Sequence, residues 1–206
     1  MNLTIFGASG QTGMFVVERA LLQENRVTAY VRTPETFPLS ADSLVVAPGD
    51  VRMPGPVAQA IEGADAVICA VGARPGSGKS KVSSEATANI IAGMNQHGVR
   101  RLIAVTAAGL SDSGPRTSRI SNLFMKVFVS LEDKERQEGL IRVSDLDWTI
   151  VRPPMLNNEP HTGSYKVGED LQPGIASKFA RADLADFILD LLTDDTYLRQ
   201  APTVCY

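Results

Sequence analysis

The chain alternates between short apolar runs and longer segments whose apolar residues recur at helical spacing. Apolar runs of strand length lie at residues 3–6, 27–31, 43–47, 65–72, 99–105 and 147–152. Helical patterns follow the first run, begin again near Pro54 or Pro56, and cover residues 82–97, 131–143 and 181–192. The run at 65–72 is apolar almost throughout, as expected for a parallel strand covered on both faces. This alternation predicts an α/β fold with a doubly wound parallel sheet.

The pattern weakens between residues 157 and 176, where only short strand-like pieces such as residues 164–167 stand out. We expect substrate specificity in this segment, because irregular segments on a rigid scaffold often carry binding residues. The last helix restores a clear apolar stripe. No repeat, low-complexity tract or linker interrupts the 206 residues, which suit a single domain with a small C-terminal substrate-binding segment.

Glycines directly follow the first apolar run and lead into the first helical segment. A strand, a glycine turn and a helix in this order are typical of a Rossmann-like dinucleotide site, although a turn that serves packing alone is the alternative. Gly7 allows the sharp turn, Gly10 lets backbone approach a pyrophosphate, and Gly13 lets the helix pack on the sheet. The helix N-terminus then attracts the phosphates. The candidate cofactor loop consists of Gly7, Ser9, Gly10, Gln11, Thr12 and Gly13.

Charged residues after the second and third apolar runs suit the adenosine half of a cofactor. Arg32 stands where NAD-selective sites have an acidic residue for the ribose 2′-hydroxyl. Its guanidinium can hold a 2′-phosphate through two hydrogen bonds, which indicates NADP(H), and a solvated surface arginine is the alternative. Asp50 can accept the adenine amino group, or it can cap the helix that begins near Pro54 or Pro56.

Two residues near the later strand ends are candidates for chemistry. Thr106 closes the fifth strand, at the edge where ligands bind in open α/β sheets, so its hydroxyl can reach nicotinamide or substrate. A threonine that merely ends a strand is the alternative. Lys134 lies among charged residues of a helical segment, as a candidate proton donor or ribose ligand, or else as a solvated helix residue. Pro153 and Pro154 end the sixth strand and make a rigid pocket wall.

A second segment, residues 73–80, satisfies a relaxed phosphate-loop pattern with alanine in place of the first glycine. It lies between a strand and a helix, as a phosphate loop should. A nucleoside-triphosphate fold would also need a strand-borne aspartate for magnesium, and it would leave the first glycine motif without a role. We therefore interpret residues 73–80 as a loop beside the nicotinamide pocket and residues 111–119 as a mobile loop over the site.

Composition narrows the class of partner. A net charge of −3 argues against broad attraction to nucleic acid, so a small molecule is the expected ligand. The 2 cysteines and 2 histidines show no metal-binding or redox spacing. No signal peptide precedes the first strand, and no apolar run approaches the roughly 20 residues of a membrane span. We expect a cytoplasmic protein that binds neither membrane nor metal.

Several short sequences together carry a family resemblance. They are Ile-Phe-Gly-Ala-Ser-Gly-Gln-Thr-Gly at 5–13, Val-Arg at 31–32, Gly-Asp-Val at 49–51, Ala-Val-Gly at 70–72, Asn-Ile-Ile-Ala-Gly-Met at 89–94, His-Gly-Val at 97–99 and Arg-Pro-Pro at 152–154. Over nearly its full length the chain resembles the atypical short-chain dehydrogenase/reductases. The specific likeness is to the NmrA-like branch, which includes the flavin reductase/biliverdin-IXβ reductase family.

The resemblance implies an NADP(H)-binding Rossmann domain with a small open substrate pocket above the nicotinamide. It implies Thr12 and Gly13 at the pyrophosphate and Arg32 at the 2′-phosphate. Around the rest of the cofactor it implies Asp50 and Val51 for adenine, Val71 and Gly72 for the ribose, Thr106 for the nicotinamide, and Pro153, Pro154 and Met155 beside its ring. Thr36 stands where some relatives have a second phosphate-binding arginine, so we expect only a soft preference for NADP(H) over NAD(H).

One departure from the short-chain dehydrogenase pattern bears on mechanism, because none of the tyrosines has a lysine four residues on. A carbonyl reductase that protonates an alkoxide with a phenol is therefore not expected. Direct hydride transfer to a flavin, quinone or tetrapyrrole needs no such acid, since the delocalised anion can take its proton from water. The sequence predicts an NAD(P)H-dependent oxidoreductase, as a monomer or weak homodimer. The alternatives are an NADP(H)-sensing regulator without turnover and an epimerase-like enzyme.

Overall fold

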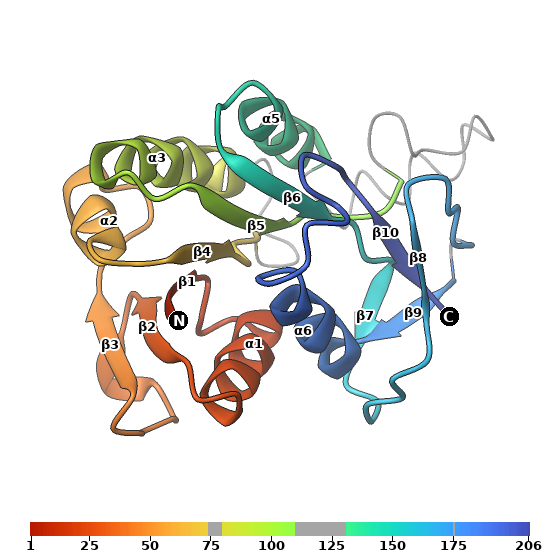
Figure 1. Ribbon diagram of the computed structural model, residues 1–206, viewed down its shortest axis with the longest axis horizontal. Helices are drawn as coiled ribbons and strands as arrows, with labels where there is room; N and C mark the ends of the chain where they lie inside the picture. The colour runs from red at the N-terminus through yellow and green to blue at the C-terminus, as the bar shows by residue number, and fades with distance from the viewer. Residues whose placement is uncertain (74–79, 110–130, 175) are drawn as a thin grey trace.

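The computed structural model describes residues 1–73, 80–109, 131–174 and 176–206. At its centre is a six-stranded parallel sheet with strand order β3-β2-β1-β4-β5-β6 (Figure 1). The strands are β1 (Asn2–Phe6), β2 (Arg26–Val31), β3 (Leu44–Pro48), β4 (Ala66–Cys69), β5 (Arg101–Val105) and β6 (Asp147–Val151). The doubly wound α/β fold predicted from the sequence is confirmed.

Helices cover both faces of this sheet. Those described are α1 (Gln11–Leu22), α2 (Pro54–Ile61), α3 (Val82–His97), α5 (Leu131–Arg142) and α6 (Arg181–Asp190), with a 3₁₀ turn η1 (Pro34–Thr36). Helices α1 and α6 pack together on one face, and α2, α3 and α5 lie side by side on the other (Figure 1). Strands that are apolar on both sides require this two-sided cover.

The alternation of side chains along β1 builds two cores. Leu3 and Ile5 belong to the cluster on the α1 and α6 side, where they join Val16. Phe6 belongs to the opposite cluster, with Val57 of α2. Burying a side chain of this size contributes about 1.5–3 kcal/mol relative to leaving it exposed. The sheet is therefore held between two buried layers, one on each face. The candidate site lies at the carboxyl ends of its strands.

The fourth apolar run pairs over a shorter stretch than predicted. The sequence indicated a strand over residues 65–72, whereas β4 ends at Cys69. The N–H of Ala70 still donates to the carbonyl of Phe6 over 2.9 Å, and the chain then leaves the ladder. Val71 and Gly72 therefore lie just beyond the sheet edge.

The C-terminal third adds short strand pairs beside the main sheet. β7 (Met155–Asn157) runs parallel to β9 (Lys178–Ala180), and β8 (Lys166–Gly168) runs antiparallel to β10 (Thr203–Cys205). The sequence indicated only the strand-like piece at residues 164–167, because three-residue strands show no usable period. Within the described residues, no helix has both the length and the apolar character needed to cross a membrane.

Candidate functional site

The glycine turn after β1 is packed too tightly for side chains. Gly7 has a φ of +80°, and a Cβ built on it would lie 2.7 Å from the carbonyl carbon of Ala70. A Cβ on Gly13 would lie 2.2 Å from the carbonyl oxygen of Gly7. The Gly10 N–H donates to the Gly7 carbonyl over 2.9 Å and closes the turn. The turn therefore presents backbone at the position predicted for a pyrophosphate.

Helix α1 begins at the point where the sheet reverses its strand order. β1 lies between β2 and β4, so its carboxyl end faces the crevice where ligands bind in open α/β sheets. The N-cap is Gly10, which has no side chain, and the first turn of the helix contains no acidic residue. The first N–H groups of a helix have no partner within it, so those of Gln11, Thr12 and Gly13 can receive an anion.

Arg32 and Asp50 lie beyond the ends of β2 and β3, at the predicted adenosine side. Hydrogen bonds from Arg52 hold the pKa of Asp50 at about 2, and the charge of Arg32 acts in the same direction. The Arg52 Nε donates to both carboxylate oxygens, over 3.0 and 3.2 Å. Asp50 does not cap α2, whose N-cap is Met53, so the capping alternative is wrong. Val51 is half-buried beside it.

Lys134 is buried in α5, so the interpretation as a solvated helix residue is wrong. Only 8% of its surface is exposed. Its ammonium donates to the carbonyls of Val71 (2.9 Å) and Val105 (3.1 Å), at the ends of β4 and β5. A third hydrogen bond of 2.9 Å runs to the side-chain oxygen of Gln137. Burial lowers the pKa of Lys134, while Cys69 and nearby carboxylates oppose this shift.

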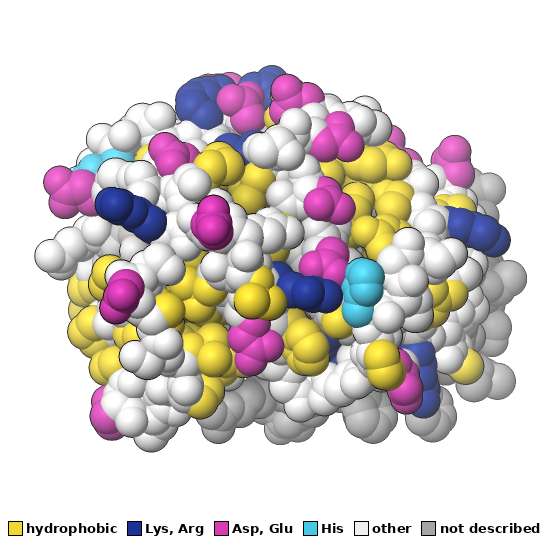
Figure 2. Space-filling model, turned by 60° about the horizontal axis from the view of Figure 1, so that its bottom comes forward, with side chains coloured by type: hydrophobic (Ala, Val, Ile, Leu, Met, Phe, Trp, Pro, Cys, Tyr) yellow, Lys and Arg dark blue, Asp and Glu magenta, His cyan; other side chains and the backbone are white. Residues whose placement is uncertain are grey.

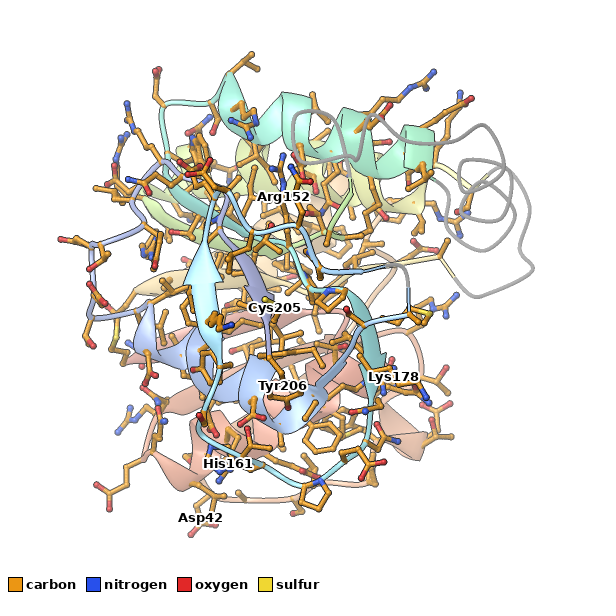
Figure 3. The ribbon with its side chains drawn as sticks, turned by 90° about the vertical axis from the view of Figure 1, so that its right-hand side faces the viewer. Asp42, Arg152, His161, Lys178, Cys205 and Tyr206 are labelled. Atoms are coloured by element: carbon orange, nitrogen blue, oxygen red, sulfur yellow. The ribbon has the colours of Figure 1, made fainter. Side chains whose placement is uncertain are left out.

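Thr106 belongs to a second buried network beside Lys134. Its hydroxyl donates to Oε1 of Glu138 over 2.7 Å, and Glu138 also accepts from Nε (3.0 Å) and Nη2 (2.5 Å) of Arg152. The side chains of Glu138 and Arg152 are each 2% exposed, and Figure 3 shows Arg152 in the interior below α5. The network joins α5 to the ends of β5 and β6, so Thr106 does more than end a strand.

The N-terminus of α3 is already filled by a carboxylate. Asp133 of α5 accepts the N–H of Ser83 over 2.8 Å and that of Ser84 over 3.0 Å. The phosphate-loop-like segment at 73–80 leads into this helix, and most of it, like the predicted loop at 111–119, lies outside the described residues. Because Asp133 occupies the position where a phosphate loop would hold phosphate, the N-terminus of α3 offers no open phosphate site.

The residues predicted beside the nicotinamide ring follow β6 at the same sheet edge. The carbonyl of Pro153 accepts the N–H of Ala108 over 2.8 Å, which ties this segment to the turn after Thr106. Pro153 is buried, Pro154 is half-buried, and Met155 is 53% exposed at the start of β7. The structure therefore brings the strand-end residues of β4, β5 and β6 together on one edge.

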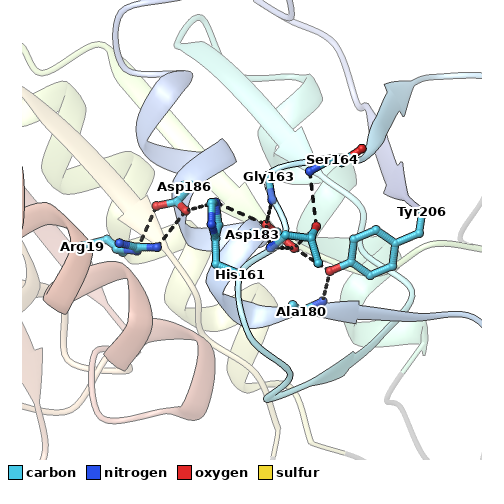
Figure 4. Close-up of polar contacts among 9 residues, drawn as sticks. Arg19, His161, Gly163, Ser164, Ala180, Asp183, Asp186 and Tyr206 are labelled. Carbon is cyan, nitrogen blue, oxygen red and sulfur yellow. Dashed lines mark hydrogen bonds and ion pairs between the residues drawn. The ribbon is translucent and has the colours of Figure 1, made fainter.

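A separate polar cluster fastens the C-terminal segments to α6 and α1 (Figure 4). The Nε2 of His161 lies 2.9 Å from Asp186, which also pairs with Arg19 at 3.0 Å. The hydroxyl of Tyr206 donates to the buried Asp183 over 2.6 Å. Among the described residues no group of histidine, cysteine, aspartate and glutamate could hold a metal ion. We interpret this cluster as a structural one that holds the C-terminal segments against α6 and α1.

Charged side chains are mixed over the face that carries α1 and β3. Figure 2 brings this face forward and shows acidic and basic groups interspersed with apolar ones among the described residues. A mixed surface exerts little long-range attraction on a polyanion.

Sequence reasoning missed most of the buried polar residues. The buried positions of α5 are Asp133, Lys134, Gln137, Glu138 and Ile141. Their spacing is that of one helical face, which is a signal present in the sequence. It escaped notice because the stripe is polar, whereas a core-facing stripe is normally recognised by its apolar residues. Arg152 carried no comparable signal.

The fold and the glycine turn together define a dinucleotide-binding α/β protein. The chain belongs to the NAD(P)H-binding family, which matches residues 7–195. It is 34% identical over 172 residues to an uncharacterized chloroplastic protein of Arabidopsis thaliana, covering 78% of this chain and 61% of that protein, so it spans less than two thirds of this relative. It is also 27% identical over 202 residues to YhfK of Bacillus subtilis, described as an uncharacterized sugar epimerase, covering 94% of this chain and 89% of that protein.

Solved structures share the fold over the whole chain. A short-chain dehydrogenase/reductase from Veillonella parvula in complex with NADP has a TM-score of 0.82 at 26% identity, covering 100% of this chain and 94% of that one. The oxidoreductase YlbE of Lactococcus lactis has a TM-score of 0.85 at 20% identity, covering 100% and 90%. ChuY of Escherichia coli O157:H7, an anaerobillin reductase, has a TM-score of 0.82 at 24% identity, covering 100% and 97%. The Rossmann-like fold predicted from the sequence agrees with all three.

Proposed function

We propose that the protein is an NADPH-dependent reductase that transfers hydride to a conjugated small-molecule acceptor such as a flavin, quinone or tetrapyrrole. The observation that carries this proposal is the glycine turn, where backbone replaces side chains and leaves the N-terminus of α1 open to a pyrophosphate. The NADP-bound relative from Veillonella parvula supports the choice of cofactor, and ChuY supports the class of acceptor. We assign the chain to the NmrA-like branch, close to the flavin reductase/biliverdin-IXβ reductase family.

The cofactor would lie across the carboxyl edge of the sheet. Thr12 and Gly13 would hold its pyrophosphate and Arg32 its 2′-phosphate, with Asp50 and Val51 around adenine. Val71 and Gly72 would contact the second ribose, and Pro153, Pro154 and Met155 would flank the nicotinamide. When bound, NADPH supplies the hydride, and the protein's part is to hold the ring and the acceptor in contact.

The two candidate catalytic side chains hold their protons in internal hydrogen bonds. The hydroxyl hydrogen of Thr106 points to Glu138, and the ammonium of Lys134 has three carbonyl-type acceptors. Neither group is free to protonate a product in this arrangement. The acceptor best suited to such a site forms a delocalised anion that takes its proton from water.

The test is oxidation of NADPH and of NADH by the purified protein against FMN, riboflavin, menadione and biliverdin, with cofactor affinity measured in parallel. Rapid NADPH oxidation with one acceptor is the expected result. Thr106→Ala should lower turnover by less than about tenfold, since general acids contribute 100-fold or more. If no dinucleotide binds, the proposal is wrong.

Arg32→Ala tests the preference for NADP(H). Loss of a charge-assisted hydrogen bond worth about 1.5–3 kcal/mol should weaken NADPH binding by about 10- to 100-fold and leave NADH binding unchanged. Arg26→Ala is the matched control, because Arg26 is an exposed arginine at the other end of the same strand. Equal losses for both cofactors would contradict the assignment of Arg32 to the 2′-phosphate.

A regulator that binds NADP(H) without turnover is the second candidate. The protons of Thr106 and Lys134 are held in internal hydrogen bonds. This favours the regulator as well, because a protein that only senses the cofactor needs no general acid. Tight NADPH binding with no oxidation on any acceptor would support the sensor. The name of the Bacillus subtilis relative raises the epimerase alternative, which would instead require an acid–base pair at the nicotinamide.

A further inference from the structure

The ammonium of Lys134 is held by three hydrogen-bond acceptors. They are the carbonyl oxygens of Val71 and Val105 and the side-chain oxygen of Gln137, at 2.9–3.1 Å. A protonated lysine has three N–H donors and no lone pair, so all three acceptors are matched. A neutral amine has only two N–H groups and would turn its lone pair toward an oxygen. These three acceptors therefore favour the charged form of Lys134, against the burial that lowers its pKa.

Neighbouring carboxylates do not form ion pairs with this ammonium. Glu138 is bound to Arg152 and Thr106, and Asp133 is bound to the N-terminus of α3. Within the described part of the chain, no carboxylate makes an ion pair with Lys134. At 8% exposure the charge is also poorly screened by water. Asp133 and Glu138 act on this charge only at longer range, so it also acts on whatever lies at the adjacent sheet edge.

That edge is the predicted nicotinamide end of the site. In a sheet of order β3-β2-β1-β4-β5-β6, a dinucleotide that crosses at β1 and β4 places its adenosine over β2 and its other half toward β5. Val71 follows β4 and Val105 ends β5, so Lys134 is bonded to the strand ends of that second half. The nicotinamide ring carries a positive charge when oxidised and none when reduced.

We propose that Lys134 is a positioning residue whose buried charge makes the site bind NADPH more tightly than NADP⁺. The inference rests on the proposed function, because it requires the nicotinamide to lie over β4 and β5. Repulsion between the ammonium and the oxidised ring would disfavour the product form and promote its exchange for NADPH. Through the two carbonyls, the same residue holds the ends of β4 and β5 at a fixed separation.

The experiment compares the dissociation constants of NADPH, NADP⁺ and 2′,5′-ADP for the wild type, Lys134→Met and Lys134→Arg. In the wild type, NADP⁺ should bind more weakly than NADPH. Lys134→Met removes the charge at similar volume and should lower the ratio of the NADP⁺ to the NADPH constant by about three- to tenfold. Lys134→Arg should keep the ratio. Binding of 2′,5′-ADP, which lacks the nicotinamide, should be similar in all three.

Equal losses of NADPH and NADP⁺ affinity in Lys134→Met would assign a structural role and overturn the proposal, as would an unchanged ratio. If Lys134→Met does not fold, Lys134→Gln, which is neutral but retains a donor, is measured in its place and should lower the ratio in the same way. If the wild type binds neither form of the cofactor, the proposed function itself is wrong. A wild type that binds both, with a ratio independent of residue 134, ends only this inference.

Discussion

The N-termini of α1 and α3 differ in what is available to bind their free N–H groups. Each helix follows a strand of the central sheet, and each begins with N–H groups that have no partner in the helix. At α3, Asp133 from another helix bonds the N–H groups of Ser83 and Ser84. At α1, the N-cap is a glycine and the first turn has no acidic residue.

The difference shows which of the two ends is reserved for a ligand. Both helix N-termini carry partial positive charge and favour an anion. The protein supplies that anion for α3 from its own α5, so this end contributes to packing. It supplies none from the first turn of α1, and the tight glycine turn keeps side chains out of the space in front of it. The phosphates of a dinucleotide can therefore bind at the N-terminus of α1.

The largest effect is expected from Gly13→Ala, which breaks the α1 site. The new Cβ would lie 2.2 Å from the Gly7 carbonyl oxygen, so backbone must shift. We expect a loss of about 1–3 kcal/mol in unfolding free energy, measured with denaturant, together with loss of NADPH binding. Gly139→Ala is the matched control, because Gly139 is an exposed helical glycine whose Cβ would meet no atom within 4 Å. It should stabilise by about 0.5–1 kcal/mol.

Asp133→Ala opens the α3 terminus and should cost about 0.5–2 kcal/mol, the usual range for a lost cap. Asp133→Asn keeps an acceptor and should lose less. Opening the terminus should also let sulfate raise the melting temperature of Asp133→Ala more than that of the wild type. An unchanged stability of Asp133→Ala would show that the carboxylate contributes nothing to α3.

Gln11→Glu gives the N-terminus of α1 a carboxylate from the protein itself, as Asp133 does for α3. A carboxylate in the first turn should stabilise the free protein by about 0.3–1 kcal/mol and weaken NADPH binding by about three- to tenfold. Gln11→Ala should change the affinity by less than about threefold, because backbone N–H groups do the binding. Melting curves and NADPH titrations of both variants check these opposite signs. A Gln11→Glu variant that binds NADPH normally would contradict the site.

The smallest effect is a difference in acid stability. Burial raises the pKa of Asp133, but hydrogen bonds from Ser84 and Ser83 outweigh it and hold the pKa below its ordinary value. The group therefore stabilises the fold above its unfolded pKa, and this contribution disappears as pH falls through the lower folded value. Unfolding measured between pH 6 and pH 2 should show a steeper loss for the wild type than for Asp133→Asn. Parallel curves would show that Asp133 does not titrate with folding.

Much of the fold was readable from the sequence because its signals are local. The prediction of α3 over residues 82–97 was confirmed at both ends, and Gly98, with a φ of +69°, supplies a left-handed C-cap. The glycine turn was equally readable, since its constraint lies within one strand-turn-helix unit. The three-residue strands β9 and β10 depend on partners distant in the sequence, and no local pattern marks them.

The buried polar residues of the site could not be predicted from the sequence, for a physical reason. Lys134 looked like a solvated residue because charged neighbours surround it in the sequence. Its burial is possible only because Val71, Val105 and Gln137 supply acceptors, and the two carbonyls come from segments 63 and 29 positions away in the sequence. Glu138 likewise needs Arg152, fourteen positions away. Such partnerships exist only after the sheet has formed.

The most direct test of the difference between the two helix ends is an amide ¹H–¹⁵N NMR titration of the protein with NADP⁺. The amides of Thr12 and Gly13 should shift with a single saturating curve, because their N–H groups receive the pyrophosphate. The amides of Ser83 and Ser84, already bonded to Asp133, should move little. Large shifts at Ser83 and Ser84 with none at Thr12 and Gly13 would contradict the central claim that α1 holds the ligand.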